Sequence, residues 1–166
     1  INLSPRHFGN PQFEERLLRL LDEYHVPASH LWVEVTERTL LENTASVRHA
    51  LQALRRAGIR ISLDDFGTGY SSLSYLTQYP IQTLKIDKSF ITNLGGDTND
   101  RNDAVIRAVL AMATTLSLQV IAEGVETREQ CDLLHKLGCR YMQGFLYGEA
   151  QPIDTWIGAA SETMLL

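Results

Sequence analysis

The sequence has few of the features that mark nucleic-acid-binding, membrane-spanning or disulfide-rich proteins. Its 15 basic residues are outnumbered by 20 acidic ones, and the formal charge of −5 argues against binding a polyanion such as duplex DNA. No apolar stretch approaches the roughly 20 residues that cross a bilayer, and the first residues show no secretory signal pattern. The two cysteines, Cys131 and Cys139, have no CxxC spacing. We therefore expect free thiols and a cytoplasmic protein or domain.

What remains is an ordinary globular composition in a chain of one domain's length or less. Of the 166 residues, 44% are hydrophobic and 21% are charged, which excludes a disordered chain. No linker, proline-rich tract or charge block divides the sequence. We treat residues 1–166 as a single unit.

Short apolar segments alternate with amphipathic ones along the chain. The short segments are typical of buried parallel strands, and they lie at residues 31–35, 59–63, 83–86, 118–121 and 140–142. Residues spaced three or four apart predict helices between them, with apolar faces made by Phe13, Leu17, Leu20 and Tyr24, by Val47, Leu51 and Leu54, and by Val105, Val109, Met112 and Leu116.

Capping residues predict where these helices begin and end. Asn10 followed by Pro11 predicts the start of the first helix. Thr127 and Gln130 are spaced as a capping box, and Gly138 is placed to end that helix. Gly58 is a second helix stop, after the segment around Leu51.

Alternating strands and helices predict an α/β fold with a parallel sheet. Pattern alone does not distinguish an open sheet from a barrel. Neither GxGxxG nor GxxxxGK[ST] follows an early strand, so the common nucleotide-binding fingerprints are absent. Instead, acidic residues recur at the carboxyl ends of successive strands, where barrel enzymes place their chemistry.

Charged and amide side chains occupy strand positions where burial makes them costly. Because the carboxyl ends of parallel strands share one edge of the sheet, we expect these side chains to converge. Carboxylates that converge repel unless a cation binds them, and an all-oxygen set without histidine favours Mg²⁺ or Mn²⁺ over zinc. The residues expected to converge are Glu34, Asp64, Asp65, Lys85, Glu123 and Gln143, and the nearby charged residues are Glu37, Asp87 and Glu126.

Each of these residues also has a purely structural interpretation. Asp65 or Glu126 alone could be a helix cap, and Lys85 could pair with a neighbouring acid or extend its ammonium to solvent. The segment that follows the acidic pair, FGTGYSSL at 66–73, could be a flexible connection. Its glycines and hydroxyls directly after Asp64 and Asp65 favour a functional loop.

The chain contains several long motifs in series, namely INLSP with Asn2, EVTE from Glu34 to Glu37, DDFGTGYSSL, LKIDKSFI, VIAEGVET and MQGFLYG. Together they resemble the EAL domain family, whose members hydrolyse cyclic di-GMP to linear pGpG. The resemblance covers essentially the whole chain. It implies a modified TIM barrel with one antiparallel strand, and dependence on Mg²⁺ or Mn²⁺.

The resemblance also implies roles for individual residues. Asn2, Glu34 and Asp64 match the ligands of one metal ion, and Asp65 matches a ligand of a second ion that Asp64 bridges. Glu123 matches a carboxylate that is either a second-metal ligand or the general base, and Lys85 matches the lysine that orients or polarises the attacking water.

Further matches lie around this set. Glu126 and Gln143 match other active-site residues. Glu37 resembles the glutamate that anchors the loop of Phe66, Gly67, Thr68, Gly69, Tyr70, Ser71 and Ser72, which in the family links the metal site to the dimer interface.

The sequence departs from the family at two places. The Glu-Ala-Leu motif is absent, so we expect the chain to be part of a barrel whose preceding strands and helices are not in this sequence. Gly148-Glu149-Ala150 stands where the family usually has glycine, a basic residue and proline. An acidic residue there is unfavourable beside a dianionic ligand.

Three functional hypotheses remain open at this point. The first is a cyclic di-GMP phosphodiesterase, at least in a longer parent, with a homodimer contact after the DDFGTGYSSL segment and a sensory or GGDEF-type domain upstream. The second is a cyclic di-GMP receptor that does not cleave its ligand. The third is a fragment that neither binds nor cleaves. Intact metal ligands favour the first hypothesis.

Overall fold

The computed structural model describes residues 1–10, 12–42, 45–68, 74–92, 94 and 99–152. Six strands form one sheet in the order β1-β2-β3-β4-β5-β6, and every neighbouring pair is parallel. The strands are β1 (Asn2–Leu3), β2 (Trp32–Thr36), β3 (Arg60–Phe66), β4 (Thr83–Ile86), β5 (Gln119–Glu123) and β6 (Tyr141–Gln143).

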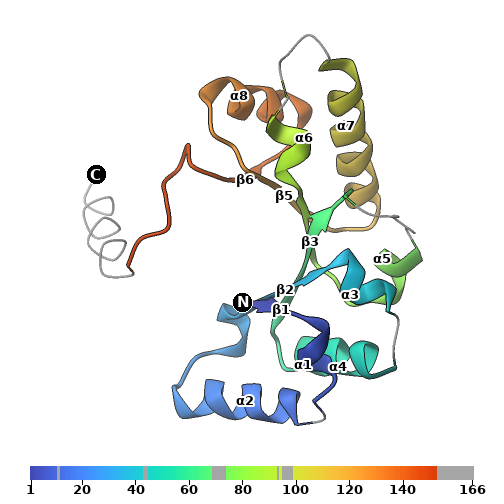
Figure 1. Cartoon of the computed structure of the whole chain (residues 1–166), viewed down its shortest axis with the longest axis vertical. Coiled ribbons are helices and arrows are strands. Elements are labelled where there is room, and N and C mark those ends of the chain that lie inside the picture. Colours follow the sequence, from blue (N-terminus) through green and yellow to red (C-terminus); the bar gives the residue numbers. More distant parts are fainter. Residues whose placement is uncertain (11, 43–44, 69–73, 93, 95–98, 153–166) are drawn as a thin grey trace.

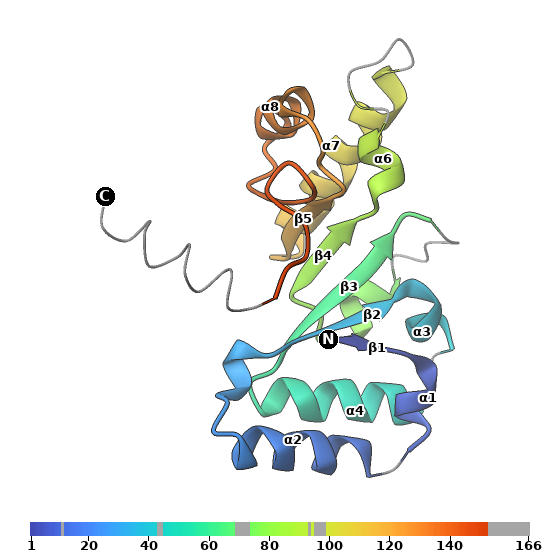
Figure 2. The ribbon, with the colours of Figure 1, turned by 60° about the vertical axis from the view of Figure 1, so that its left-hand side comes forward.

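Helices connect consecutive strands, as parallel pairing requires. They are α1 (Pro5–Phe8), α2 (Phe13–Glu23), α3 (Glu37–Leu41), α4 (Ala45–Arg56), α5 (Ser74–Gln78), α6 (Lys88–Thr92), α7 (Asn99–Thr115) and α8 (Arg128–Leu137), with a 3-10 turn at Ala28–His30. In Figures 1 and 2, α1, α2 and α4 lie near β1, whereas α7 and α8 lie near β5 and β6. Among these helices, none has the length and apolar content needed to cross a bilayer.

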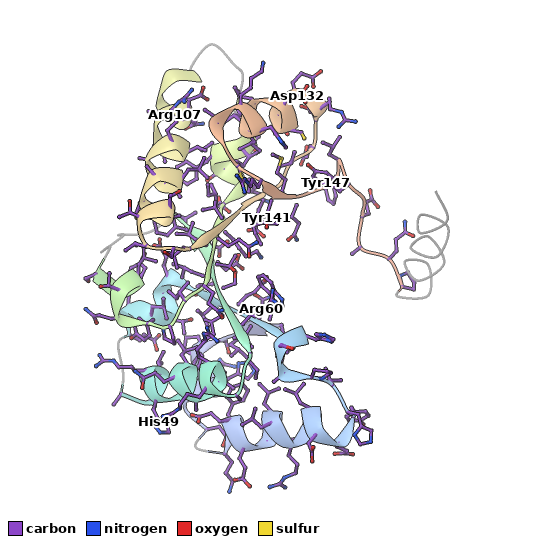
Figure 3. The ribbon with its side chains drawn as sticks, turned by 180° about the vertical axis from the view of Figure 1, so that it is seen from behind. His49, Arg60, Arg107, Asp132, Tyr141 and Tyr147 are labelled. Carbon is purple, nitrogen blue, oxygen red and sulfur yellow. The ribbon has the colours of Figure 1, made fainter. Side chains whose placement is uncertain are left out.

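The two faces of the sheet differ in chemistry because strand side chains alternate. One face is apolar and packs against the helices: Val33, Val35, Ile61, Leu63, Leu84 and Ile86 are all at most 1% exposed. The opposite face carries Glu34, Ser62 and Lys85. Figure 3 shows Arg60 and Tyr141 on the side of the sheet away from α4 and α7. The Arg60 guanidinium lies 5.1 Å from the centre of the Trp32 ring.

The predicted α/β fold is confirmed, and all five predicted strands are present within a few residues of the expected bounds. The antiparallel strand that the family resemblance implies is not among the six described strands. β1 and β6 form the edges of the sheet and do not pair with each other, so within the described residues the sheet is open.

The predicted caps are confirmed at two of the three helices. Thr127 and Gln130 form the capping box of α8, and Gly138 ends that helix with φ +95°. Gly58 follows α4 with φ +98°. The first predicted helix, α2, begins later than expected, because its N-cap is Gln12 and not Asn10. Oδ1 of Asn10 accepts a hydrogen bond from the Gln12 amide at 3.0 Å.

Two predicted apolar faces are only partly buried. Tyr24, beyond the end of α2, is 70% exposed, and Leu20 is 42% exposed. On α7, Val105 is 39% exposed, and the adjacent Ile106 is the residue that is buried in the core. The spacing identified both helices but misjudged which residues face the core. Pro11 lies outside the described residues.

Candidate metal centre

Three carboxylates converge at the carboxyl ends of β3 and β5. One oxygen from each of Asp64, Asp65 and Glu123 lies within 4.8 Å of the other two. The chain joins β3 to β5 through β4, which lies between them in the sheet. The prediction that acidic residues from separate strand ends come together is therefore confirmed for these three.

An extra residue in β3 allows two adjacent aspartates to face the same site. Leu63 pairs with Leu84 and Phe66 pairs with Ile86, so β3 advances three residues while β4 advances two. Asp65 occupies this bulge with φ +55°. In a regular strand the side chains of Asp64 and Asp65 would point to opposite faces, whereas a bulge re-aims one of them.

Lys85 binds three carboxylates from three different strands. Its Nζ lies 2.7 Å from Glu123, 2.9 Å from Glu34 and 3.2 Å from Asp64. The residue is 4% exposed. Burial alone would lower the pKa of Lys85, but the hydrogen bonds to Glu123 and Glu34 and the charge of Asp64 outweigh burial and raise it. Lys85 is thus a fixed positive charge, and the pairing with neighbouring acids that its structural interpretation describes is present.

Two acids of the cluster, Asp65 and Glu123, have raised pKa values. Burial raises the pKa of Asp65, and the adjacent charge of Asp64 raises it further. Burial also raises the pKa of Glu123, although the hydrogen bond from Lys85 opposes this. One ammonium among four carboxylates leaves excess negative charge. A donor set made only of carboxylate oxygens fits a hard divalent cation such as Mg²⁺ or Mn²⁺.

The affinity for Mn²⁺ is expected to weaken as the pH falls, beginning at a higher pH than for ordinary carboxylates. A bound cation requires Asp65 and Glu123 to be deprotonated, and their raised pKa values mean that protons compete with the metal at higher pH. Calorimetry at about pH 7.5 and about pH 5.5 would measure this change across the range just above the usual carboxyl values. An affinity that is flat over this interval contradicts the assignment.

The other predicted site residues lie at the strand ends without joining the three-carboxylate cluster. Asn2 is the register partner of Glu34 across β1 and β2, and Gln143 is the partner of Glu123 across β5 and β6. The side chains of Asn2 and Gln143 are exposed. Glu126 is exposed as well, and its backbone amide donates to Gln130 Oε1 at 2.8 Å.

Glu37 contacts the start of the loop that follows Asp65. It is 4% exposed, and its Oε1 accepts a hydrogen bond from the Gly67 amide at 3.1 Å. Phe66 is buried, and the Thr68 hydroxyl donates to the Asp65 carbonyl at 2.9 Å. The predicted loop residues Gly69, Tyr70, Ser71 and Ser72 lie outside the described residues.

The sequence did not reveal the hydrogen bonds that two residues near the site, Asp87 and Gln130, make with α6. Asp87 caps α6, since its Oδ1 accepts a hydrogen bond from the Ser89 amide at 2.9 Å. Its position two residues after Lys85 suggested only a shared strand face. Gln130 was recognised as half of a capping box, but its side chain also reaches Ile91 (see below). No helix was predicted directly after Asp87, so the sequence offered no signal for this cap.

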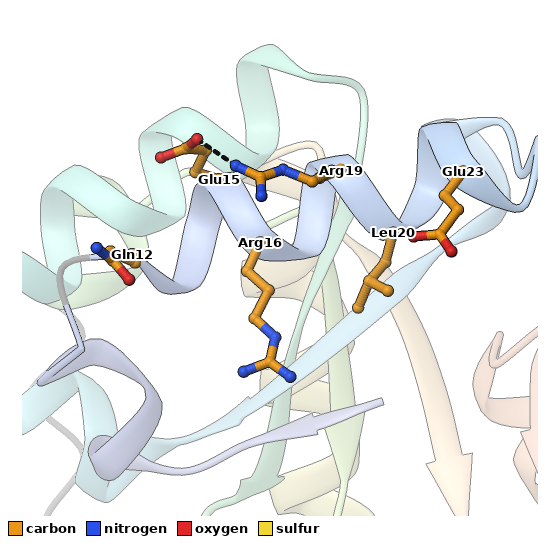
Figure 4. Close-up of a pocket in the computed structure, with 6 residues that line it drawn as sticks. All are labelled: Gln12, Glu15, Arg16, Arg19, Leu20 and Glu23. Carbon is orange, nitrogen blue, oxygen red and sulfur yellow. Dashed lines mark hydrogen bonds and ion pairs between the residues drawn. The ribbon is translucent and has the colours of Figure 1, made fainter.

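A separate crevice runs along the outer side of α2 (Figure 4). It is lined by Gln12, Glu15, Arg16, Arg19, Leu20 and Glu23. Glu15 and Arg19 form an ion pair of 2.6 Å in which both side chains are 72% exposed, so it contributes little to stability. None of the clustered carboxylates lines this crevice, so we do not assign a metal site or a catalytic role to it.

Comparison with known proteins identifies similar chains. The family model described as "EAL domain" matches residues 1–150. The bifunctional diguanylate cyclase/cyclic di-GMP phosphodiesterase MucR of Pseudomonas aeruginosa is 39% identical over 161 residues, covering 97% of this chain and 23% of MucR. The chain spans about a fifth of the length of the curated relatives it matches first.

Solved structures agree with the sequence comparison. The MucR phosphodiesterase in complex with c-di-GMP has a TM-score of 0.86 and 40% identity, covering 93% of this chain and 62% of that one. BlrP1 of Klebsiella pneumoniae, solved with manganese and cyclic di-GMP, has a TM-score of 0.81 and 33% identity, covering 88% of this chain and 37% of that one.

Proposed function

Because this chain belongs to the EAL domain family, we propose that its strand-end carboxylates form the metal centre of a cyclic di-GMP phosphodiesterase that releases linear pGpG. The observation that carries the proposal is the convergence of Asp64, Asp65 and Glu123 within 4.8 Å. Relatives with the same fold are named as cyclic di-GMP phosphodiesterases or were solved with cyclic di-GMP and manganese, which supports the substrate and the cation.

Asp64, Asp65 and Glu123 would hold Mg²⁺ or Mn²⁺, with Glu34 and Asn2 contributing to one of two ions. When bound, such ions lower the pKa of a coordinated water and offset charge on the phosphoryl oxygens. Asp64 belongs to the cluster, shares Lys85 with Glu34 as Glu123 does, and lies on β3, the strand that pairs with the Glu34 strand β2. This position suits a bridging carboxylate.

Lys85 would place a permanent positive charge beside the reacting phosphodiester. Its ammonium is held by carboxylates from β2, β3 and β5, so it needs little reorganisation as negative charge develops. It would orient the attacking water, with Glu123 able to accept a proton through its raised pKa. Glu126 and Gln143, at the exposed rim, would contact the substrate.

The surroundings of the site suggest how it is regulated. The Glu37 to Gly67 hydrogen bond ties the loop after Asp65 to α3. We propose that this loop connects the metal centre to a homodimer contact, and that a sensory or GGDEF-type domain precedes the EAL domain in a longer cytoplasmic or membrane-anchored parent. The name of the relative MucR combines a diguanylate cyclase activity with a cyclic di-GMP phosphodiesterase activity, which supports a second domain of this kind.

The experiment is a titration with cyclic di-GMP in the presence of Mn²⁺, together with chromatographic detection of linear pGpG. It is carried out on a domain-length polypeptide, meaning these 166 residues joined to the segment that would complete the barrel. Binding with product release supports the phosphodiesterase. Binding without product identifies a receptor, and the absence of both identifies an inert domain.

The 166-residue chain by itself is expected to be inactive or nearly so. The first metal would have at most Asn2, Glu34 and Asp64 as protein ligands, and β1 is an open edge of the sheet. An open site is also wet, which weakens each electrostatic interaction within it. Turnover of cyclic di-GMP by the chain and by the domain-length polypeptide would be compared. Equal rates would show that the additional segment is unnecessary.

A further inference from the structure

The short helix α6 lies between the two strand ends that supply the clustered carboxylates. It follows β4, whose neighbours β3 and β5 end in Asp64–Asp65 and in Glu123. Gly67 is two residues beyond Asp65, and Gly124 comes directly after Glu123. Both glycines touch α6, one on each side of the cluster.

On the β3 side, the ring of Phe90 lies against the backbone of Gly67. A Cβ atom added to Gly67 would be 2.7 Å from Phe90 Cε2, which leaves no room for a side chain. The φ of Gly67 is +98°. The Gly67 amide donates to Glu37, so the segment is held between α3 and α6.

On the β5 side, the first residue of α6 lies equally close to Gly124. A Cβ atom added to Gly124 would be 2.5 Å from Lys88 Cβ. The other end of α6 is tied to the same turn, since buried Gln130 donates from Nε2 to the Ile91 carbonyl at 3.2 Å. The Oε1 of Gln130 accepts from the amides of Glu126 and Thr127 at 2.8 and 3.1 Å.

We propose that α6 is a spacer that sets the separation between the Asp64–Asp65 pair and Glu123, with Phe90 and Lys88 as positioning residues. The inference rests on the proposed metal centre. Three like charges within 4.8 Å repel one another and the single charge of Lys85 offsets only part of this repulsion, so contacts that brace the two strand ends help to hold their spacing. Coordination distances tolerate changes of only about 0.2 Å. Contacts that position ligands therefore affect metal affinity.

The glycines of this chain provide matched variants to test the spacer. Gly67 and Gly58 share a φ of +98°, but a Cβ at Gly58 would meet its nearest atoms at 3.9 Å. Gly124 and Gly138 form a second pair, since a Cβ at Gly138 would meet nothing within 4 Å although its φ is +95°. Alanine at all four positions adds backbone strain. Only Gly67→Ala and Gly124→Ala also push against α6.

Mn²⁺ affinity of the 166-residue chain would be measured by calorimetry at a temperature where thermal unfolding shows each variant to be folded. We expect Gly67→Ala and Gly124→Ala to weaken it about tenfold or more, the range for removing a group that orients a ligand. Gly58→Ala and Gly138→Ala should bind as the wild type does.

Phe90→Leu retains both glycines and keeps the test decisive where an alanine variant does not fold. It should also weaken Mn²⁺ binding, because the smaller side chain no longer fills the space against Gly67. The spacer role of α6 would be contradicted if Phe90→Leu bound Mn²⁺ with wild-type affinity. It would also be contradicted if the two members of each glycine pair lost equal Mn²⁺ affinity. A wild-type chain that binds no Mn²⁺ would instead overturn the metal centre itself.

Discussion

Replacing Asp64 with alanine is expected to weaken Mn²⁺ binding by the 166-residue chain by more than about 100-fold, because removing only the partner of a ligand costs 10–100-fold. Asp64 belongs to the three-carboxylate cluster and, like Glu123, also pairs with Lys85. Its loss leaves Glu34 and Glu123 bound to Lys85, and Asp65 without its neighbouring ligand. Calorimetry with Mn²⁺ measures the change.

Asp132→Ala is the matched control for this substitution. Asp132 is an exposed acid on α8, so its removal changes the net charge by the same amount without touching the cluster. It should bind Mn²⁺ with wild-type affinity. In the domain-length polypeptide, Asp64→Ala should also abolish measurable pGpG formation. Unchanged Mn²⁺ affinity in Asp64→Ala would remove this residue from the ligand set.

Replacing Lys85 with alanine in the domain-length polypeptide should lower kcat for cyclic di-GMP by about 100-fold or more, the scale of losing one positioned electrostatic group. KM should change far less. The ammonium is buried between carboxylates from three strands, so it acts on charge that develops during the reaction more than on the approach of substrate.

Lys136→Ala provides the comparison, since Lys136 is an exposed lysine on α8. It should leave kcat and KM unchanged. Thermal unfolding of both variants separates a loss of chemistry from a loss of fold, because removing Lys85 leaves Glu34, Asp64 and Glu123 without their shared cation. A change confined to KM would assign Lys85 to substrate binding.

Much of the fold could be predicted because its signals are local. The strands that became β2 to β6 are short apolar segments, and the capping box of Thr127 and Gln130 is read directly from spacing. The buried faces of α2 and α7 were harder to predict. Whether Tyr24 or Ile106 is covered depends on which other elements pack there, and this information is not local.

The candidate site was predictable at the level of composition but not of geometry. Charged residues at buried strand ends indicated a cation site, and the structure brings Asp64, Asp65 and Glu123 together. The bulge at Asp65 could not be predicted, since it is visible only in the register of β3 against β4. The contacts of Phe90 and Lys88 with two glycines likewise depend on tertiary approach.

The proposed metal centre is tested most directly by a crystal structure of the domain-length polypeptide soaked with Mn²⁺, with an anomalous-scattering map calculated at the manganese edge. We expect a peak at about 2.2 Å from carboxylate oxygens of Asp64, Asp65 and Glu123, the distance expected for carboxylate oxygens on a divalent metal. A map with no peak at these residues, or with a peak bound by other side chains, would contradict it.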